Sequence, residues 1–191
     1  MEQILTLYHS TESRLTSSIV IDLVKRATGN RSIYGFAEFY EPLRARTGVL
    51  SQANALSEAA EAWVDVLEVF TYGTWKDYVG LGYRAPELNE AQITKLRQLT
   101  LVSLAGRSAR LGFDEIVEAT GVEVGQVEGL VVDAVYADLL DARVDTKEQA
   151  VVVARAVGRD ANKERLAELG RVLGSWEGLA VGLIRETSQR V

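Results

Sequence analysis

The stretch from Asn89 to Asp160 constrains the fold of this chain more than any other part of its sequence. It begins with a long helical pattern that Asn89 can cap, and a short helical pattern follows over residues 115–120. A second long helical pattern runs from about residue 125 to residue 140, and a two-stranded hairpin comes after it. Three helices followed by a hairpin are the element order of a winged helix, an architecture that commonly binds DNA. The first question is therefore whether this module could meet a nucleic acid.

The hairpin is predicted from two β-rich runs, Arg143–Asp145 and Ala150–Val153, around the polar turn Thr146–Gln149. We expect these to be the only strands in the chain. Because two strands alone are marginal in water, the hairpin must pack against the helices or join the sheet of a neighbour. By its exposed backbone groups, the edge strand Ala150–Val153 is expected to be able to extend such a sheet.

The first 88 residues read as short helices. One apolar face recurs every four residues until Gly29, a second helix starts near Ser32 and stops at Pro42, and a loop is expected from Leu43 to Asn54. A stronger helix ends at Gly73. The sequence therefore predicts a mainly α protein: a helical-repeat array (1–88), capped by a winged-helix subdomain with a small β-hairpin (89–160), and a long C-terminal helix (161–191).

The helix that would enter a DNA groove lacks the chemistry for it. Residues 126–142 contain no Lys or Arg, whereas Glu128, Asp133, Asp138 and Asp141 are spread along them. Groove-reading helices carry Arg, Lys, Asn or Gln toward bases and phosphates. The basic residues that lie nearby are expected to form a solvated helix face: Arg97, Arg107 and Arg110. Many Val and Leu residues on the third helix leave two options open, the helical array or a protein partner.

Composition argues against an enzyme or a metal protein. The chain of 191 residues has a net charge of −6, no cysteine and a single histidine, His9, near the N-terminus. A disulfide framework and a thiolate metal site are excluded, and a Ser-His triad or a multi-histidine zinc site would have to be built around this one histidine, which we expect to be an ordinary surface or packing residue. No phosphate-binding glycine loop, secretion signal or apolar run long enough for a membrane is present. We expect no catalytic, cofactor, metal or small-molecule site and no nucleic-acid or membrane partner.

The C-terminal helix carries the clearest interaction signal. Its apolar residues alternate by three and four, which is the seam of a helix bundle: Leu166, Leu169, Leu173, Trp176, Ala180 and Leu183. As one helix it would be about 45 Å long, against about 40 Å for a compact domain made from the rest of the chain. We therefore expect part of the seam to meet helices of other proteins, with folding back along its own domain as the alternative. Four glycines spaced by four, from Gly170 to Gly182, indicate close neighbours on a second side.

Several long segments resemble the PCI-domain family, and in particular the PCI subunits of the COP9 signalosome. They are DVLEVFTYGTWKDY (Asp65–Tyr78), PELNEAQITKLRQLTLVSLA (Pro86–Ala105), EGLVVDAVYADLLDARVD (Glu128–Asp145) and the tripeptide Gly158–Asp160. The resemblance covers the chain from about Ser32 onward and departs at Ala142-Arg143, where Gly-Lys is expected.

The resemblance implies a non-catalytic scaffold in a complex that removes the ubiquitin-like modifier Nedd8 from cullins, in cytoplasm and nucleus. Its winged helix would pair with other PCI subunits, and its C-terminal helix would join a bundle formed by several subunits. The residues expected to meet partners at the wing are Arg143, Val144, Ala150, Val151, Val152 and Val153. Two rivals remain: a PCI subunit of the proteasome lid or of a translation-initiation complex, and, from another class, a nucleic-acid-binding winged-helix protein.

Overall fold

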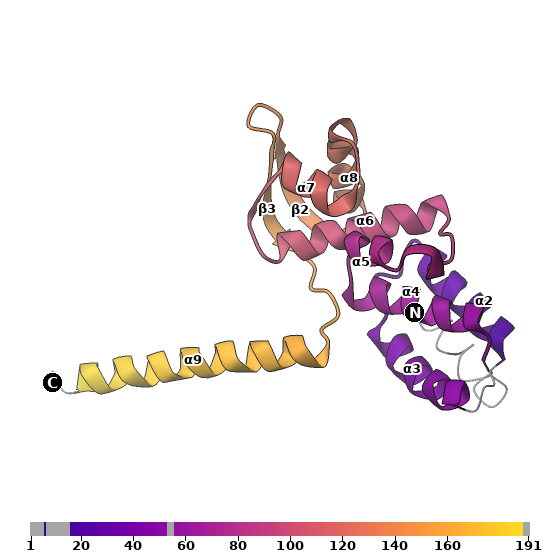
Figure 1. Ribbon diagram of the computed structural model, residues 1–191. Helices are drawn as coiled ribbons and strands as arrows, with labels where there is room; N and C mark the ends of the chain where they lie inside the picture. Colours follow the sequence, from indigo (N-terminus) through magenta and orange to yellow (C-terminus); the bar gives the residue numbers. More distant parts are fainter. Residues whose placement is uncertain (1–5, 7–15, 53–55, 189–191) are drawn as a thin grey trace. The chain divides into compact units, whose positions relative to one another are not determined.

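The computed structural model describes residue 6 and residues 16–52 and 56–188, and these divide into two units, residues 1–160 and residues 161–191 (Figure 1). The first unit holds a helical part, a winged helix and a small sheet. Its elements in chain order are α2 (Ser17–Gly29), α3 (Ala37–Gln52), α4 (Glu58–Tyr72), α5 (Trp75–Gly80), the 3-10 turn η2 (Gly82–Arg84), α6 (Glu90–Ala105), β1 (Arg110–Gly112), α7 (Phe113–Thr120), α8 (Val124–Tyr136), β2 (Leu140–Asp145) and β3 (Ala150–Ala156). The second unit is the single helix α9 (Lys163–Ser188). The mainly α fold with a small sheet and a long last helix is thus confirmed.

The helical part is organised around α4, which packs against both α2 and α3. Its core is aromatic and aliphatic, and Phe36, Phe39 and Phe70 are completely buried there. Phe36 and Phe70 meet edge to face, with ring centroids 6.0 Å apart. Apolar burial of this extent is the main force that holds such short helices in place.

Helix α3 does not stop at Pro42, and the loop expected after Pro42 is wrong. The helix starts later than expected, at Ala37, and runs through Pro42 to Gln52. Proline costs a helix about 3 kcal/mol because one hydrogen bond is lost and the ring crowds the preceding turn. Here Phe39, Leu43 and Thr47 are buried at spacings of four on either side of the exposed Pro42. Tertiary burial of that face outweighs the local cost.

The winged helix forms as predicted at its start. The Asn89 side chain accepts from the backbone N–H of Gln92 at 2.8 Å, and the Gln92 side chain accepts from the N–H of Asn89 at 2.9 Å. This reciprocal cap fixes the first turn of α6. Gly121 closes α7 in the left-handed conformation, with φ +64°. A side chain would be strained at that position.

The sheet has three strands, so the expectation of only two is wrong. Its order is β1-β3-β2, with both pairs antiparallel. The additional strand, β1, holds only Arg110, Leu111 and Gly112, and a run of three residues with one apolar member gives no readable alternation. Because β3 lies in the middle, its backbone is paired on both sides. The free edge expected at Ala150–Val153 is therefore also wrong.

Helix α8 ends at Tyr136, four residues before the predicted end. Asp138 adopts φ +58°, which turns the chain, and the backbone N–H of Leu139 bonds to the carbonyl of Ala134 at 3.0 Å. The apolar Leu139 and Leu140 then enter the core of the winged helix as the chain moves into β2. The sequence did not indicate this turn, because apolar residues lie on both sides of Asp138 and their periodicity does not separate a buried helix end from a buried strand.

Helix α6 belongs to two hydrophobic cores. Leu96 and Leu99 pack in the core of the helical part, whereas Leu101 and Val102 pack in the core of the winged helix. The two parts of the first unit are consequently built on one shared helix. The division of the chain at residue 88 stays a prediction.

Candidate protein–protein interface

The outer edge of the sheet is the backbone of β2. Val153 donates its N–H to the carbonyl of Ala109 at 2.8 Å, and Phe113 donates to the carbonyl of Gln149 at 2.9 Å. In an antiparallel strand alternate residues bond to opposite neighbours, so Gln149, Val151 and Val153 pair toward β1. The even-numbered residues of β3 therefore pair toward β2.

The register shows which β2 groups remain free. Val152 lies opposite Arg143, and Ala150 lies opposite Asp145. The backbone groups of Arg143 and Asp145 thus face β3, and those of Val144 face the outer edge. Because β2 is an edge strand, this register leaves the Val144 N–H and carbonyl without a partner strand in the described part of the chain. An unpaired strand edge of this kind is a template for a strand from another protein.

The structure separates the candidate wing residues into two groups. Arg143 is exposed, Val144 is half-buried on the edge strand, and Val152 is 44% exposed on the outer face of the sheet. Ala150, Val151 and Val153 are buried in the central strand and are not available to a partner in this form of the chain. The turn Thr146–Gln149 is confirmed, and the Asp145 carboxylate accepts from the backbone N–H groups of Lys147 and Glu148 at 3.1 and 3.0 Å.

Only two of the four acids ascribed to the third helix lie on it. Glu128 and Asp133 are exposed on α8, whereas Asp138 lies in the following turn and Asp141 lies on β2. Asp138 is paired with Arg155 at 3.2 Å. The surface of α8 nevertheless carries acids and no base, as the sequence predicts.

The three nearby arginines do not share one helix face, so that expectation is wrong. Arg107 and Arg110 lie beyond the end of α6, and Arg110 faces Glu148 at 3.8 Å. Arg97 donates to the carbonyls of Thr120 and Gly121, both at 3.2 Å. Its guanidinium also lies over the Trp75 ring, 4.8 Å from the centroid. Arg97 therefore caps the end of α7, because a helix C-terminus leaves carbonyls without partners.

Arg159 joins the winged helix to the end of α4. Its guanidinium donates to the carbonyls of Phe70 at 2.8 Å and Thr71 at 3.0 Å, and to the carbonyl of Gly73. It also donates to the Ser103 hydroxyl on α6 at 2.8 Å. Burial lowers the pKa of Arg159 to about 10, and the carbonyls of the last turn of α4 compensate for that burial.

The next residue, Asp160, caps the N-terminus of α3. Its carboxylate accepts from the backbone N–H groups of Phe36 at 2.6 Å and Ala37 at 3.0 Å, where α3 begins. A negative charge at a helix N-terminus is favourable because the free N–H groups and the helix dipole both attract it. The tripeptide ending at Asp160 thus fixes the exit of the wing against α3 and α4. From the sequence, this tripeptide was identified only as part of the family resemblance, and its structural role was not predicted.

Lys95 makes a third connection between the two parts of the unit. This buried lysine of α6 donates to the carbonyl of Ile33 at 3.0 Å and to that of Asn30, just after α2. Its ammonium also lies near the rings of Tyr34 and Phe36. Burial lowers the pKa of Lys95 to about 8.

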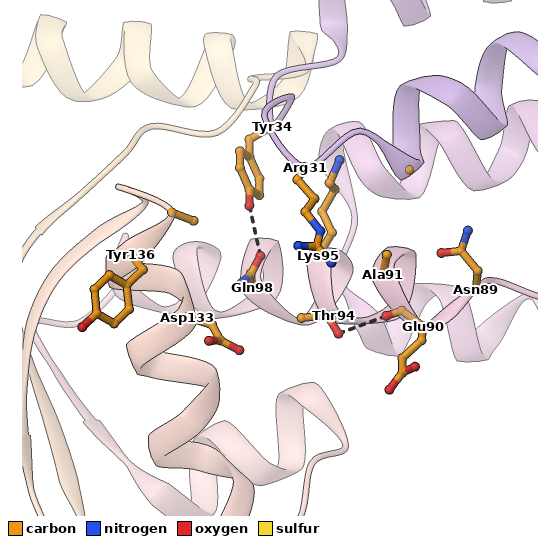
Figure 2. A pocket seen from close by; sticks show the side chains of 12 residues that line it. Arg31, Tyr34, Asn89, Glu90, Ala91, Thr94, Lys95, Gln98, Asp133 and Tyr136 are labelled. Carbon is orange, nitrogen blue, oxygen red and sulfur yellow. Dashed lines mark hydrogen bonds between the residues drawn. The ribbon is translucent and has the colours of Figure 1, made fainter.

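An open pocket of about 890 Å³ lies where the segment after α2, the first half of α6 and the last turn of α8 meet. In Figure 2, Arg31 and Lys95 run side by side between the loop and α6, and Asp133 and Tyr136 stand across from them on α8. Tyr34 donates to the Gln98 side-chain oxygen at 3.2 Å. Neither the sequence pattern nor the expected site residues pointed to this pocket.

Helix α9, taken by itself, is one amphipathic helix of 26 residues. The seam residues Leu166, Leu169, Leu173, Trp176 and Ala180 follow one another at spacings of three and four along it. Its four glycines are separated by one helical turn each, and no second element of its unit lies beside them. A single helix cannot cover its own apolar face, so this face requires a partner element.

The described residues were also compared with the requirements of a metal site and of a membrane-spanning helix. No group of three or more His, Cys, Asp or Glu side chains is arranged to hold a metal ion there. His9 lies outside the described residues. Among the helices that are described, none combines the length and the apolar character needed to cross a membrane.

Residues 83–155 match the PCI-domain family, and this range runs from within η2 through the winged helix to most of β3. The matched range is less than half of the chain. The chain is also similar to subunit 7 of the COP9 signalosome. The resemblance inferred from the sequence segments is thus confirmed.

The individual likenesses differ in coverage. COP9 signalosome complex subunit 7a of Pongo abelii is 38% identical over 112 residues, which are 58% of this chain and 41% of that protein. COP9 signalosome complex subunit 7 of Dictyostelium discoideum is 24% identical over 190 residues, or 98% of this chain and 69% of that protein. Eukaryotic translation initiation factor 3 subunit M of Bos taurus is 27% identical over 90 residues, covering 47% of this chain and 24% of that protein. The chain therefore aligns with less than half the length of the mammalian relative named first.

Proposed function

We propose that this chain is a non-catalytic assembly subunit of a COP9 signalosome, the complex that removes Nedd8 from cullins. The likeness to signalosome subunit 7 over nearly the whole chain supports this assignment. The likeness to the initiation-factor subunit spans about half the chain, so an initiation complex is the weaker candidate. A location in cytoplasm and nucleus follows from the same proposal.

The observation that carries the proposal is the unpaired β2 edge. A strand of a neighbouring PCI subunit can add to β2 by bonding the free N–H and carbonyl of Val144. Arg143 and Asp145 are exposed on that strand and offer a charge of each sign to the side chains of the incoming strand. Such pairs across an interface select the partner and its register more than they add affinity.

Helix α9 supplies the second attachment in this proposal. Its seam from Leu166 through Trp176 to Ala180 would pack into a bundle with the last helices of other subunits, and the side chain of the remaining seam residue, Leu183, lies outside the described ones. The glycines from Gly170 to Gly182 would let a second neighbour approach the backbone closely. Two independent attachments would raise the effective affinity well above that of either one alone.

Co-expression with the other signalosome subunits, followed by size-exclusion chromatography, tests the assignment. The full chain is expected to elute in a stable subcomplex and a chain ending at Asp160 in a weaker one. Absence of any subcomplex with the full chain would contradict the proposal. A parallel titration with generic DNA and RNA addresses the rival class, because phosphate binding weakens steeply with salt. The net charge of −6 leads us to expect no binding at physiological salt.

A further inference from the structure

The outward face of α8 is apolar where a DNA-reading helix would be basic. The opposite face of α8 packs in the core of the winged helix through Val127, Leu130, Val131 and Ala134. The outward face exposes Val132 by 45%, Val135 by 39% and Tyr136 by 88%. Contiguous exposed apolar side chains on a helix mark a surface that meets another molecule.

Two glycines lie on this same outward face. At 100° per residue, Gly125 and Gly129 fall beside Val132 and Tyr136 around the helix axis. A Cβ atom at either glycine would meet nothing within 4 Å. Each glycine costs a helix about 1 kcal/mol relative to alanine, and no packing in the described chain explains that cost. Their missing side chains leave room for a partner backbone.

The pocket beside the last turn of α8 offers donors to a partner. Gln98 and Arg31 both line it, and the Gln98 side-chain oxygen accepts from Tyr34 at 3.2 Å. Arg31 is exposed, and a guanidinium has donors but no acceptor. The pocket is therefore suited to a carbonyl or carboxylate of an incoming chain.

The charges around this surface select the partner further. Glu128 and Asp133 are exposed beside the apolar residues of α8, and Glu90 stands at the rim of the pocket. Residues 124–137 contain no Lys or Arg. Arg31 is the exposed cation on the other side of the pocket. A partner that complements this surface therefore has an apolar stripe bordered by basic residues and a hydrogen-bond acceptor at one end.

We propose that the outward face of α8 and the adjoining pocket form a docking surface for an amphipathic helix of another protein. The apolar stripe of that helix packs on Val132, Val135 and Tyr136, and its backbone approaches along Gly125 and Gly129. Its Lys or Arg side chains face Glu128 and Asp133. The free carbonyls of its C-terminal end reach Arg31, since a helix end leaves such acceptors unpaired. This surface uses side chains of α8 and α6 rather than the backbone edge of β2.

Photo-crosslinking with the full chain tests the proposal. A benzophenone side chain replaces Tyr136, and the probe is a synthetic amphipathic peptide of about 18 residues, five helical turns, with a leucine stripe bordered by lysines. The lysine peptide is expected to crosslink in a saturable manner, and a matched peptide with glutamates in place of the lysines is not. Asp133→Lys and Gly129→Gln should each weaken the apparent affinity by at least about tenfold.

Controls separate this site from general attraction to an acidic protein. Glu115→Lys makes the same charge change on an exposed position of α7 and should leave crosslinking unchanged. Gly129→Gln should keep or raise the melting temperature, because glutamine is the better helix former. Equal crosslinking of both peptides, or crosslinking that survives Asp133→Lys and Gly129→Gln, would overturn the proposal. Crosslinks between two copies of the chain that exclude the peptide would overturn it in favour of self-association.

Discussion

Replacement of Arg159 by Met should separate two contributions of this side chain to stability: its hydrogen bonds to the end of α4 and the packing of its apolar stem. Methionine keeps an unbranched apolar stem but removes every donor that meets the carbonyls of Phe70, Thr71 and Gly73. A hydrogen bond to a charged group contributes about 1.5–3 kcal/mol to stability. The total loss is smaller than the sum over the lost hydrogen bonds, because Met also removes the cost of burying the guanidinium. We expect the free energy of unfolding to fall by about 2–4 kcal/mol. For a chain of this size that is a drop of roughly 4–16 °C in melting temperature.

Urea denaturation followed by far-ultraviolet circular dichroism measures this loss. Arg159→Lys should be intermediate, because a compact ammonium has three donors and cannot reproduce the fork that spans α4 and α6. Arg155→Met is the control, since among the described residues the ion-pair partner of Arg155 is Asp138, in an exposed pair. This change should alter stability by less than about 1 kcal/mol. If Arg159→Met unfolds at the urea midpoint of the wild type, the capping argument is wrong.

Further predictions concern other buried or strained positions. The folded pKa of Lys95, about 8, lies below its unfolded value, so the cost of burying its charge is present below pH 8 and is relieved toward pH 10.5. The stability of the wild type relative to Lys95→Met should therefore rise between pH 7 and pH 9.5 in paired urea titrations; a constant difference would refute this. Gly121→Ala should lose about 1–3 kcal/mol by calorimetry, because φ is +64° and its Cβ would lie 2.7 Å from the Trp75 ring nitrogen. Val152→Pro, in the central strand, should unfold the wing, whereas the exposed Arg143→Glu should leave the melting temperature unchanged and impair only subunit assembly. Loss of stability with Arg143→Glu would show that the residue serves the fold.

The sequence predicted the parts of the fold that depend on local signals. The Asn89 cap, the stop at Gly121 and the turn after Asp145 all follow from short-range chemistry, and all three are present. Helix α3 was misread because burial of Leu43 and Thr47 depends on α4, which local periodicity at Pro42 does not reveal. Strand β1 was missed because three residues acquire strand geometry only through pairing with β3.

The contacts that hold the two parts of the first unit together could not be predicted from a single sequence. Lys95 lies 65 residues from the Asn30 carbonyl that it caps, and Arg159 lies 89 residues from Phe70. A lysine or an arginine in these positions looks like an ordinary surface charge in the sequence. The pocket beside α8 has the same origin, because Tyr34, Gln98 and Tyr136 come from three separate segments.

The role of the β2 edge in assembly is tested most directly by a pair of proline substitutions. Val144→Pro removes an N–H that faces the outer edge, whereas Arg143→Pro removes an N–H that bonds to β3. Each variant of the full chain is co-expressed with the other signalosome subunits, and the fraction recovered in the subcomplex is measured beside the urea midpoint of the isolated chain. Val144→Ala controls for the lost side chain. We predict that Val144→Pro loses assembly while its midpoint stays near that of Val144→Ala, and that Arg143→Pro loses stability. Full assembly of a stable Val144→Pro chain would contradict strand addition at β2.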